Sequence, residues 1–170
     1  VIQFDKNKFM LRSINKIASK HIIRGVLKMK NILVPIENFS EDQEIITEAV
    51  ELAKKFDSEI TLFHVDNAQM LVSRLQYEAY IDREIMTEKM DTKESQEKLI
   101  KKYNDQGVVN VNVKELVGDP ASEILNEANE GDYDLVVMRT HGMTATKRFM
   151  LGSVTNKVVH HIKKPILVVR

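Results

Sequence analysis

The chain of 170 residues contains no cysteine. A protein without cysteine cannot build a disulfide scaffold, a thiolate metal site or a cysteine nucleophile. The sequence also lacks any apolar run near the roughly 20 residues that a membrane-spanning helix needs. These absences favour one cytoplasmic domain without a membrane partner, and the length is sufficient for a layered hydrophobic core.

The chain has no net charge, but its charges are unevenly distributed. Residues 1–28 contain seven basic residues and one acidic residue, whereas residues 29–170 contain 18 basic and 24 acidic residues. Nucleic-acid binding depends on basic side chains that neutralise phosphates. The acidic body of the chain therefore predicts that DNA and RNA are not its partners.

Residues 1–28 form a basic extension in front of the first strand pattern. Its apolar residues recur at roughly helical spacing, which is typical of a membrane-surface helix or a transit-like presequence. A third interpretation is a translated upstream leader, because the codons of Arg24-Gly25-Val26 can contain a purine-rich ribosome-binding sequence before Met29. We favour this third interpretation, and so expect residues 1–28 to be non-native or disordered and residues 29–170 to be the domain.

From Met29 onward, short apolar runs alternate with amphipathic helical patterns. Strands are predicted at 32–36, 59–66, 108–117, 134–138 and 165–169. Helices are predicted from an N-cap at Ser40, within about 75–105, from Pro120 after the cap residue Asp119, and over 153–162. This alternation predicts an α/β three-layer sandwich whose five-stranded sheet is mostly parallel.

The stretch after the fourth strand is the most informative for function. It reads Arg139-Thr-His141-Gly142, then nine residues, then Gly152-Ser153-Val154-Thr155. A glycine-containing loop between a strand and a helix presents backbone N–H groups that suit a phosphate, and Ser153 and Thr155 add hydroxyl donors. The alternative is that the glycines only shape the connection and that Ser153 only caps the helix.

Other segments should converge on this loop. In parallel α/β sheets, ligands bind beyond the carboxyl ends of the strands, where the strand order reverses. This rule brings together three segments, namely Pro35-Ile36-Glu37, Val65-Asp66 and Met138-Arg139. Their convergence on one phosphate loop favours a nucleotide as the ligand.

Residues 29–170 resemble a single-domain universal stress protein. The resemblance rests on I-L-V-P at 32–35, L-F-H-V-D at 62–66, V-G-D-P-A at 117–121, D-L-V-V-M-R-T-H-G at 134–142 and L-G-S-V-T-N-K-V at 151–158. It implies a Rossmann-like fold with strand order 3-2-1-4-5. It also implies that the chain binds ATP, with or without Mg²⁺, or a related adenine nucleotide.

The nucleotide signature of that family is Gly-x2-Gly-x9-Gly-Ser/Thr. Gly142 and Gly152 match its second and third glycines and Ser153 matches its hydroxyl residue, whereas Arg139 replaces the first glycine. The arginine would either obstruct the adenosine site or pair with the phosphates as a fork. We favour obstruction, because the family places a glycine there.

Two further positions carry over from the resemblance. Glu37 stands where an acidic residue, usually Asp, holds the ribose hydroxyls, and Val65 stands where the backbone meets adenine. No residue is expected to be catalytic or to bind a metal, and His64 is expected to be a satisfied core histidine.

The function implied is a stress-response or signalling module with little or no turnover of its nucleotide. The alternatives are a nucleotide-free dimerising stress protein and an adenylyl-transferring enzyme, although the usual pyrophosphate motifs of such enzymes are absent. The resemblance also implies a homodimer through the edge strand 165–169, and Val168→Lys is expected to favour the monomer.

Overall fold

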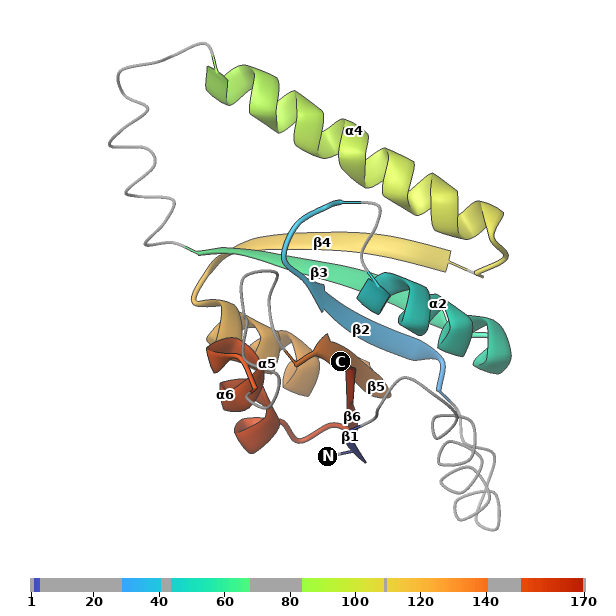
Figure 1. The fold of residues 1–170 in the computed structure, drawn as a ribbon, viewed down its shortest axis with the longest axis vertical. Coiled ribbons are helices and arrows are strands. Elements are labelled where there is room, and N and C mark those ends of the chain that lie inside the picture. Colours follow the sequence, from blue (N-terminus) through green and yellow to red (C-terminus); the bar gives the residue numbers. More distant parts are fainter. Residues whose placement is uncertain are drawn as a thin grey trace.

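The computed structural model describes residues 2–3, 29–40, 44–67, 84–108, 110–140 and 151–169. The strands are β1 (Ile2–Gln3), β2 (Asn31–Ile36), β3 (Glu59–Asn67), β4 (Asn110–Gly118), β5 (Leu135–Arg139) and β6 (Ile166–Val169). The helices are α2 (Glu44–Phe56), α4 (Glu84–Asp105), α5 (Pro120–Glu130) and α6 (Ser153–His161). From β2 onward the strands are all parallel and lie in the order β4-β3-β2-β5-β6, which confirms the predicted order 3-2-1-4-5 (Figure 1).

Helices cover both faces of this sheet. Figure 1 shows α2 and α4 on one side and α5 and α6 on the other. Alternate side chains of β3 enter the two resulting cores: Ile60 and Leu62 pack towards α2 and α4, and Phe63 and Val65 pack towards α5 and α6. The period of two along a strand therefore produces the three-layer sandwich that the sequence predicts.

A sixth strand, which the sequence does not predict, lies beside β6. Ile2 and Gln3 of β1 pair in parallel with Leu167 and Val168. Residues 4–28 lie outside the described residues, so the interpretation of residues 1–28 as a leader stays a prediction. In the described conformation β1 occupies part of the edge that was expected to join two copies of the chain.

The predicted boundaries of two helices fall partly on residues that are not described. The structure gives α2 from Glu44, so the helix cap expected at Ser40 is separated from it by the undescribed residues 41–43; the backbone N–H of Ser40 donates to Asn38 Oδ1. Residues 75–83 of the helix predicted within about 75–105 are likewise outside the described residues, and α4 begins at Glu84. Within the described ranges, none of the helices has the length and apolar character required to cross a membrane.

The start of α5 is linked to α6 through Asp119. Its carboxylate accepts hydrogen bonds from the Ser122 backbone N–H at 3.0 Å and from the Ser122 hydroxyl at 2.5 Å, as the predicted cap requires. The ammonium of Lys157, on α6, lies 2.9 Å from the same oxygen. Hydrogen bonds from Ser122 and from Lys157 lower the pKa of Asp119 to about 2.

We expect Asp119→Ala to destabilise the fold by about 1 kcal/mol at pH 7, the usual cost of losing an N-cap. Because the folded pKa of Asp119 is lowered, its contribution is complete above about pH 4 and is lost as the pH falls through about 2. Urea unfolding of both proteins at pH 7 and near pH 2 measures this. An equal stability difference at the two pH values would show that the ionised carboxylate is not the stabilising group.

Candidate functional site

The strands β2 and β5 separate towards their carboxyl ends. They pair only at Ile32 with Leu135 and at Leu33 with Val136. Beyond these pairs, β2 continues beside β3 as far as Ile36, and β5 continues beside β6 as far as Arg139. We call the region between the carboxyl ends of β2 and β5 the switch point, because the strand order reverses there, and it is where ligands of such sheets bind.

The end of β3 borders the switch point. Its last residue paired with β2 is His64, and Val65, Asp66 and Asn67 pair only with β4. The side chain of Val65 is buried in the core under α5 and α6. The side chain of Val65 thus belongs to the core, and the expected contact of its backbone with adenine stays a prediction.

The other predicted residues near the ends of β2 and β5 differ in whether their side chains are exposed. Ile36 and Met138 are buried, at 7% and 4% exposure, so their side chains belong to the two cores. Pro35 is half-buried, and Glu37 is exposed directly after the end of β2. Of the segment Pro35-Ile36-Glu37, Glu37 is thus the residue whose side chain is exposed, just beyond the carboxyl end of β2.

The amino terminus of α6 follows the same edge of the sheet. Gly152 is its N-cap, no side chain caps it, and the Gly152 N–H donates to the carbonyl of Thr140 at 2.6 Å. The next backbone N–H groups, those of Ser153, Val154 and Thr155, are in the first helical turn and have no carbonyl four residues earlier within the helix. These N–H groups can donate hydrogen bonds to an anion, and the positive end of the helix dipole favours its binding.

The hydroxyl of Thr155 has a structural role. It donates to the carbonyl of Arg139 at 2.8 Å, and the side chain is buried at 6% exposure. The bond joins the first turn of α6 to the end of β5 and fixes where the helix begins. The hydroxyl proton of Thr155 is therefore not available for the donation to a phosphate that the sequence predicts. The side chain of Ser153, in contrast, is exposed.

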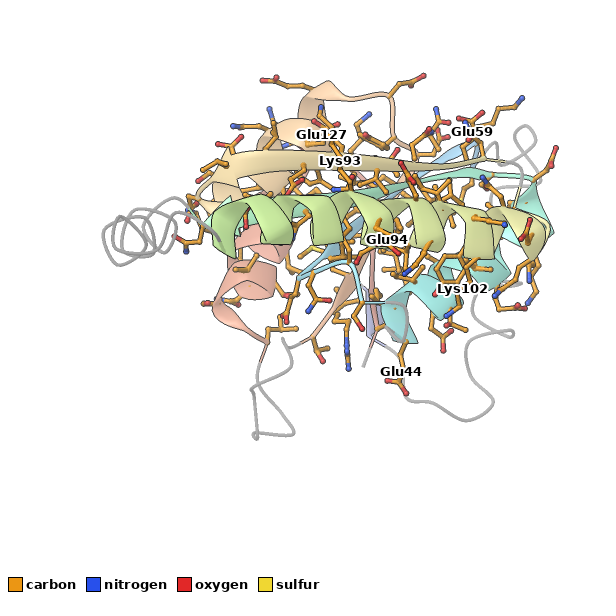
Figure 2. The ribbon with its side chains drawn as sticks, turned by 90° about the horizontal axis from the view of Figure 1, so that it is seen from above. Glu44, Glu59, Lys93, Glu94, Lys102 and Glu127 are labelled. Atoms are coloured by element: carbon orange, nitrogen blue, oxygen red, sulfur yellow. The ribbon has the colours of Figure 1, made fainter. Side chains whose placement is uncertain are left out.

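Arg139 has a partner that the sequence did not predict. Its guanidinium Nη2 lies 3.7 Å from Glu44 Oε2, at the start of α2, and the two side chains are 37% and 56% exposed. Figure 2 shows Glu44 projecting from the end of α2 away from the body of the sheet. The arginine therefore reaches from β5 towards α2, past the carboxyl end of β2, which lies between β5 and β3 in the sheet.

The remaining predicted residues, His141 and Gly142, lie outside the described part of the chain. The structure thus brings the ends of β2, β3 and β5 and the start of α6 to one edge of the sheet. The contacts of the phosphate loop between residues 141 and 150 stay a prediction.

Comparison with known proteins gives consistent results. A model of the universal stress protein family matches residues 28–170. A universal stress protein of Methanocaldococcus jannaschii is 32% identical over 168 residues, which are 97% of this chain and 96% of the relative. The solved universal stress protein from Lactobacillus plantarum has a TM-score of 0.62 at 24% identity and covers 84% of this chain and 99% of its own.

Two solved universal stress proteins of the same fold contain adenine nucleotides. One is a complex with cAMP, with a TM-score of 0.57 and 16% identity over 84% of this chain and 98% of that one. The other, from Archaeoglobus fulgidus, is a complex with dAMP, with a TM-score of 0.56 and 18% identity over 84% and 99%. At these identities the likeness shows a shared fold.

Proposed function

This chain belongs to the universal stress protein family, and from that premise we propose that it binds ATP or a related adenine nucleotide at the switch point. The nucleotide acts as a signal that biases the conformation or the partners of the protein, with little or no turnover. The observation that carries the proposal is the start of α6, which has no side-chain cap and follows the strand that diverges from β2.

The described residues suit the three parts of such a ligand. Phosphates fit the backbone N–H groups of Ser153, Val154 and Thr155 and the positive end of the helix dipole. We expect the carboxylate of Glu37, which is exposed just after β2, to accept hydrogen bonds from ribose hydroxyls, and the backbone of Val65 at the end of β3 to contact adenine. Mg²⁺ would enter with the triphosphate, held mainly by phosphate oxygens.

The family's known structures support the choice of an adenine nucleotide. Members of the same fold have been solved with cAMP and with dAMP. Because these two ligands share the adenine base but differ in their phosphates, the base is the part that we expect this chain to recognise as well. The triphosphate is the part that depends on Gly152 and on the loop before it.

Mass spectrometry of small molecules released from the purified, denatured protein tests this function. The proposal predicts an adenine nucleotide in the released fraction, or stoichiometric uptake of ATP when the protein is first stripped of ligand. If the protein releases no nucleotide and takes up none, the alternative of a nucleotide-free dimerising stress protein holds instead. Release of pyrophosphate or transfer of an adenylyl group would instead identify an enzyme.

Arg139→Gly is expected to tighten ATP binding. The side chain of Arg139 extends towards Glu44, beside the position where we expect adenosine to bind. A glycine at position 139 restores the first glycine of the family signature. The ion pair that is lost is largely exposed, so the fold should change in stability by less than about 1 kcal/mol. Calorimetric titration with ATP measures the effect. A loss of affinity would show that the guanidinium pairs with phosphate rather than obstructing the site.

We also propose that two copies associate through β6. In the described conformation β1 pairs with Leu167 and Val168, so this association requires β1 to leave. Val168 is only 1% exposed, and a lysine there would disrupt the core as well as an interface. We therefore expect a chain that starts at Met29 to form dimers at lower concentration than the full chain, as sedimentation velocity can measure. Equal association of both chains would contradict the competition between β1 and a second copy.

A further inference from the structure

A cluster of one histidine and two carboxylates lies at the carboxyl end of β3, on the face that α2 and α4 cover. His64 and Asp66 are two residues apart on β3 and so point to the same face, and Glu115 of β4 is directly opposite His64 in the register. One ligand atom from each residue lies within 4.8 Å of the others. Asp66 Oδ1 is 3.3 Å from His64 Nε2.

The imidazole of His64 lies between two groups that only accept hydrogen bonds. Its Nδ1 is 3.2 Å from the carbonyl oxygen of Ile36, and its Nε2 faces the Asp66 carboxylate. A neutral imidazole has one N–H and one lone pair, so it can donate to only one of them. If Nδ1 donates to the carbonyl, the lone pair of Nε2 points at a carboxylate, and a cation bound between them would satisfy both groups.

This arrangement is the one that metal-binding histidines usually adopt. A ligating histidine donates its other N–H to a carbonyl or a carboxylate, which fixes the tautomer and the orientation of the ring. Here the carbonyl of Ile36 supplies that support, and Phe39 packs edge-on against the ring at a centroid distance of 5.2 Å. The side chain of His64 is 14% exposed and that of Asp66 is 43% exposed, so an ion can reach the cluster from solvent.

We infer that His64 Nε2, Asp66 and Glu115 form a binding site for a divalent transition metal of the Zn²⁺ type. Imidazole favours Zn²⁺ over Mg²⁺ or Ca²⁺, and two carboxylates neutralise its charge. The ligand atoms of a tetrahedral Zn²⁺ site lie roughly 3.4 Å apart, so the 3.3 Å contact already fits. The longer separations, of up to 4.8 Å, would close by rotation of Glu115, an exposed side chain whose Oε2 accepts from Gln96 of α4 at 3.1 Å.

The charges around the cluster agree with this inference. Among the residues that the structure describes, Asp66 and Glu115 form no ion pair with a lysine or an arginine.

The site is separate from the proposed phosphate site at α6. The ring of His64, however, bonds to the last residue of β2, directly before Glu37, so a bound metal would hold the strand end that carries the proposed ribose contact.

Titration of the full chain with Zn²⁺ alone, at pH 7.5 and without nucleotide, tests the site. The wild type should bind one ion more tightly than Glu115→Gln and Asp66→Asn, by about 10- to 100-fold. Both substitutions keep the size of the side chain, remove its charge and replace one acceptor oxygen with an NH2 group. Glu59→Gln is the matched control, because Glu59 is an exposed carboxylate at the opposite end of β3 (Figure 2).

The other four histidines of the chain can also bind Zn²⁺, so the number of ions bound must be read for each variant. The inference predicts that Glu115→Gln and Asp66→Asn each lose one equivalent, or bind it at least about tenfold more weakly, while Glu59→Gln behaves as the wild type. Zn²⁺ should also raise the melting temperature of the wild type and of Glu59→Gln more than that of Glu115→Gln. Equal binding by all four proteins would overturn the site, whatever the outcome with ATP.

Discussion

Replacement of Gly152 by valine should reduce the affinity for ATP at least about 100-fold, equal to about 2.8 kcal/mol. Gly152 is the N-cap of α6, and its φ of −59° and ψ of 157° are open to any residue. Valine therefore introduces no backbone strain there. Its branched side chain would occupy the space in front of the first-turn N–H groups, which the phosphates need in order to approach the backbone.

The comparison with Gly152→Ala makes this experiment specific. Alanine adds one methyl group at the same backbone conformation, so we expect a smaller loss of affinity than for valine. Calorimetry gives the affinities, and thermal unfolding shows whether each variant keeps the stability of the wild type. If a folded Gly152→Val protein bound ATP with wild-type affinity, the phosphates could not be bound at the start of α6.

The largest effect on stability is expected for Phe63→Ala, which should lower the free energy of unfolding by about 3–5 kcal/mol. Phe63 is the largest of the fully buried side chains, with 0% exposure, and it lies on the interior strand β3, between β2 and β4, in the core under α5 and α6. Truncation removes its transfer free energy and leaves a cavity, because the neighbouring elements cannot collapse fully.

Leu116→Ala is the control for Phe63→Ala. Leu116 is an apolar residue of the neighbouring strand β4, but it is 37% exposed, so its truncation should change stability by about 0.5 kcal/mol or less. Urea unfolding measures both variants. Comparable losses for the two would show that burial, as the structure describes it, does not determine which side chains stabilise the sheet.

The order of the elements could be predicted because each strand and helix has its own local pattern of apolar residues. Runs such as Ile32–Ile36 are buried on both faces of a parallel strand, and Asp119 with Pro120 marks the start of a helix. The short strand β1 has no such signal, because two residues are too few for a pattern to be detected. Its partner β6 lies at the other end of the chain, and no local pattern in the sequence indicates that pairing.

The candidate site could be predicted only as far as its backbone. Strand ends and a glycine before a helix have sequence signatures, so the switch point and the start of α6 were placed correctly at one edge of the sheet. Side-chain pairs between distant segments have none. The contacts of Arg139 with Glu44 and of Thr155 with the Arg139 carbonyl therefore emerged only from the structure.

The metal cluster had a partial signal in the sequence. The alternation that buries Val111 and partly buries Val113 on the helix-covered face of β4 continues to Glu115, which places a carboxylate on an apolar face. Glu115 is exposed, so this carboxylate alone does not identify a site without knowledge of its neighbours. Its neighbour on β3, His64, could be identified only after the register between β3 and β4 was known.

Binding of an adenine nucleotide at the switch point is tested most directly by mapping amide chemical shifts during titration of the ¹⁵N-labelled protein with ATP. We predict saturable shifts at the amides of Gly152, Ser153 and Val154 and at those of Val65 and Glu37, with little change at Glu59, at the far end of β3. Shifts of this pattern would place the phosphates on α6 and the adenosine at the carboxyl ends of β2 and β3, beside the switch point. A titration that leaves the amides of α6 and of Val65 unchanged would contradict the account.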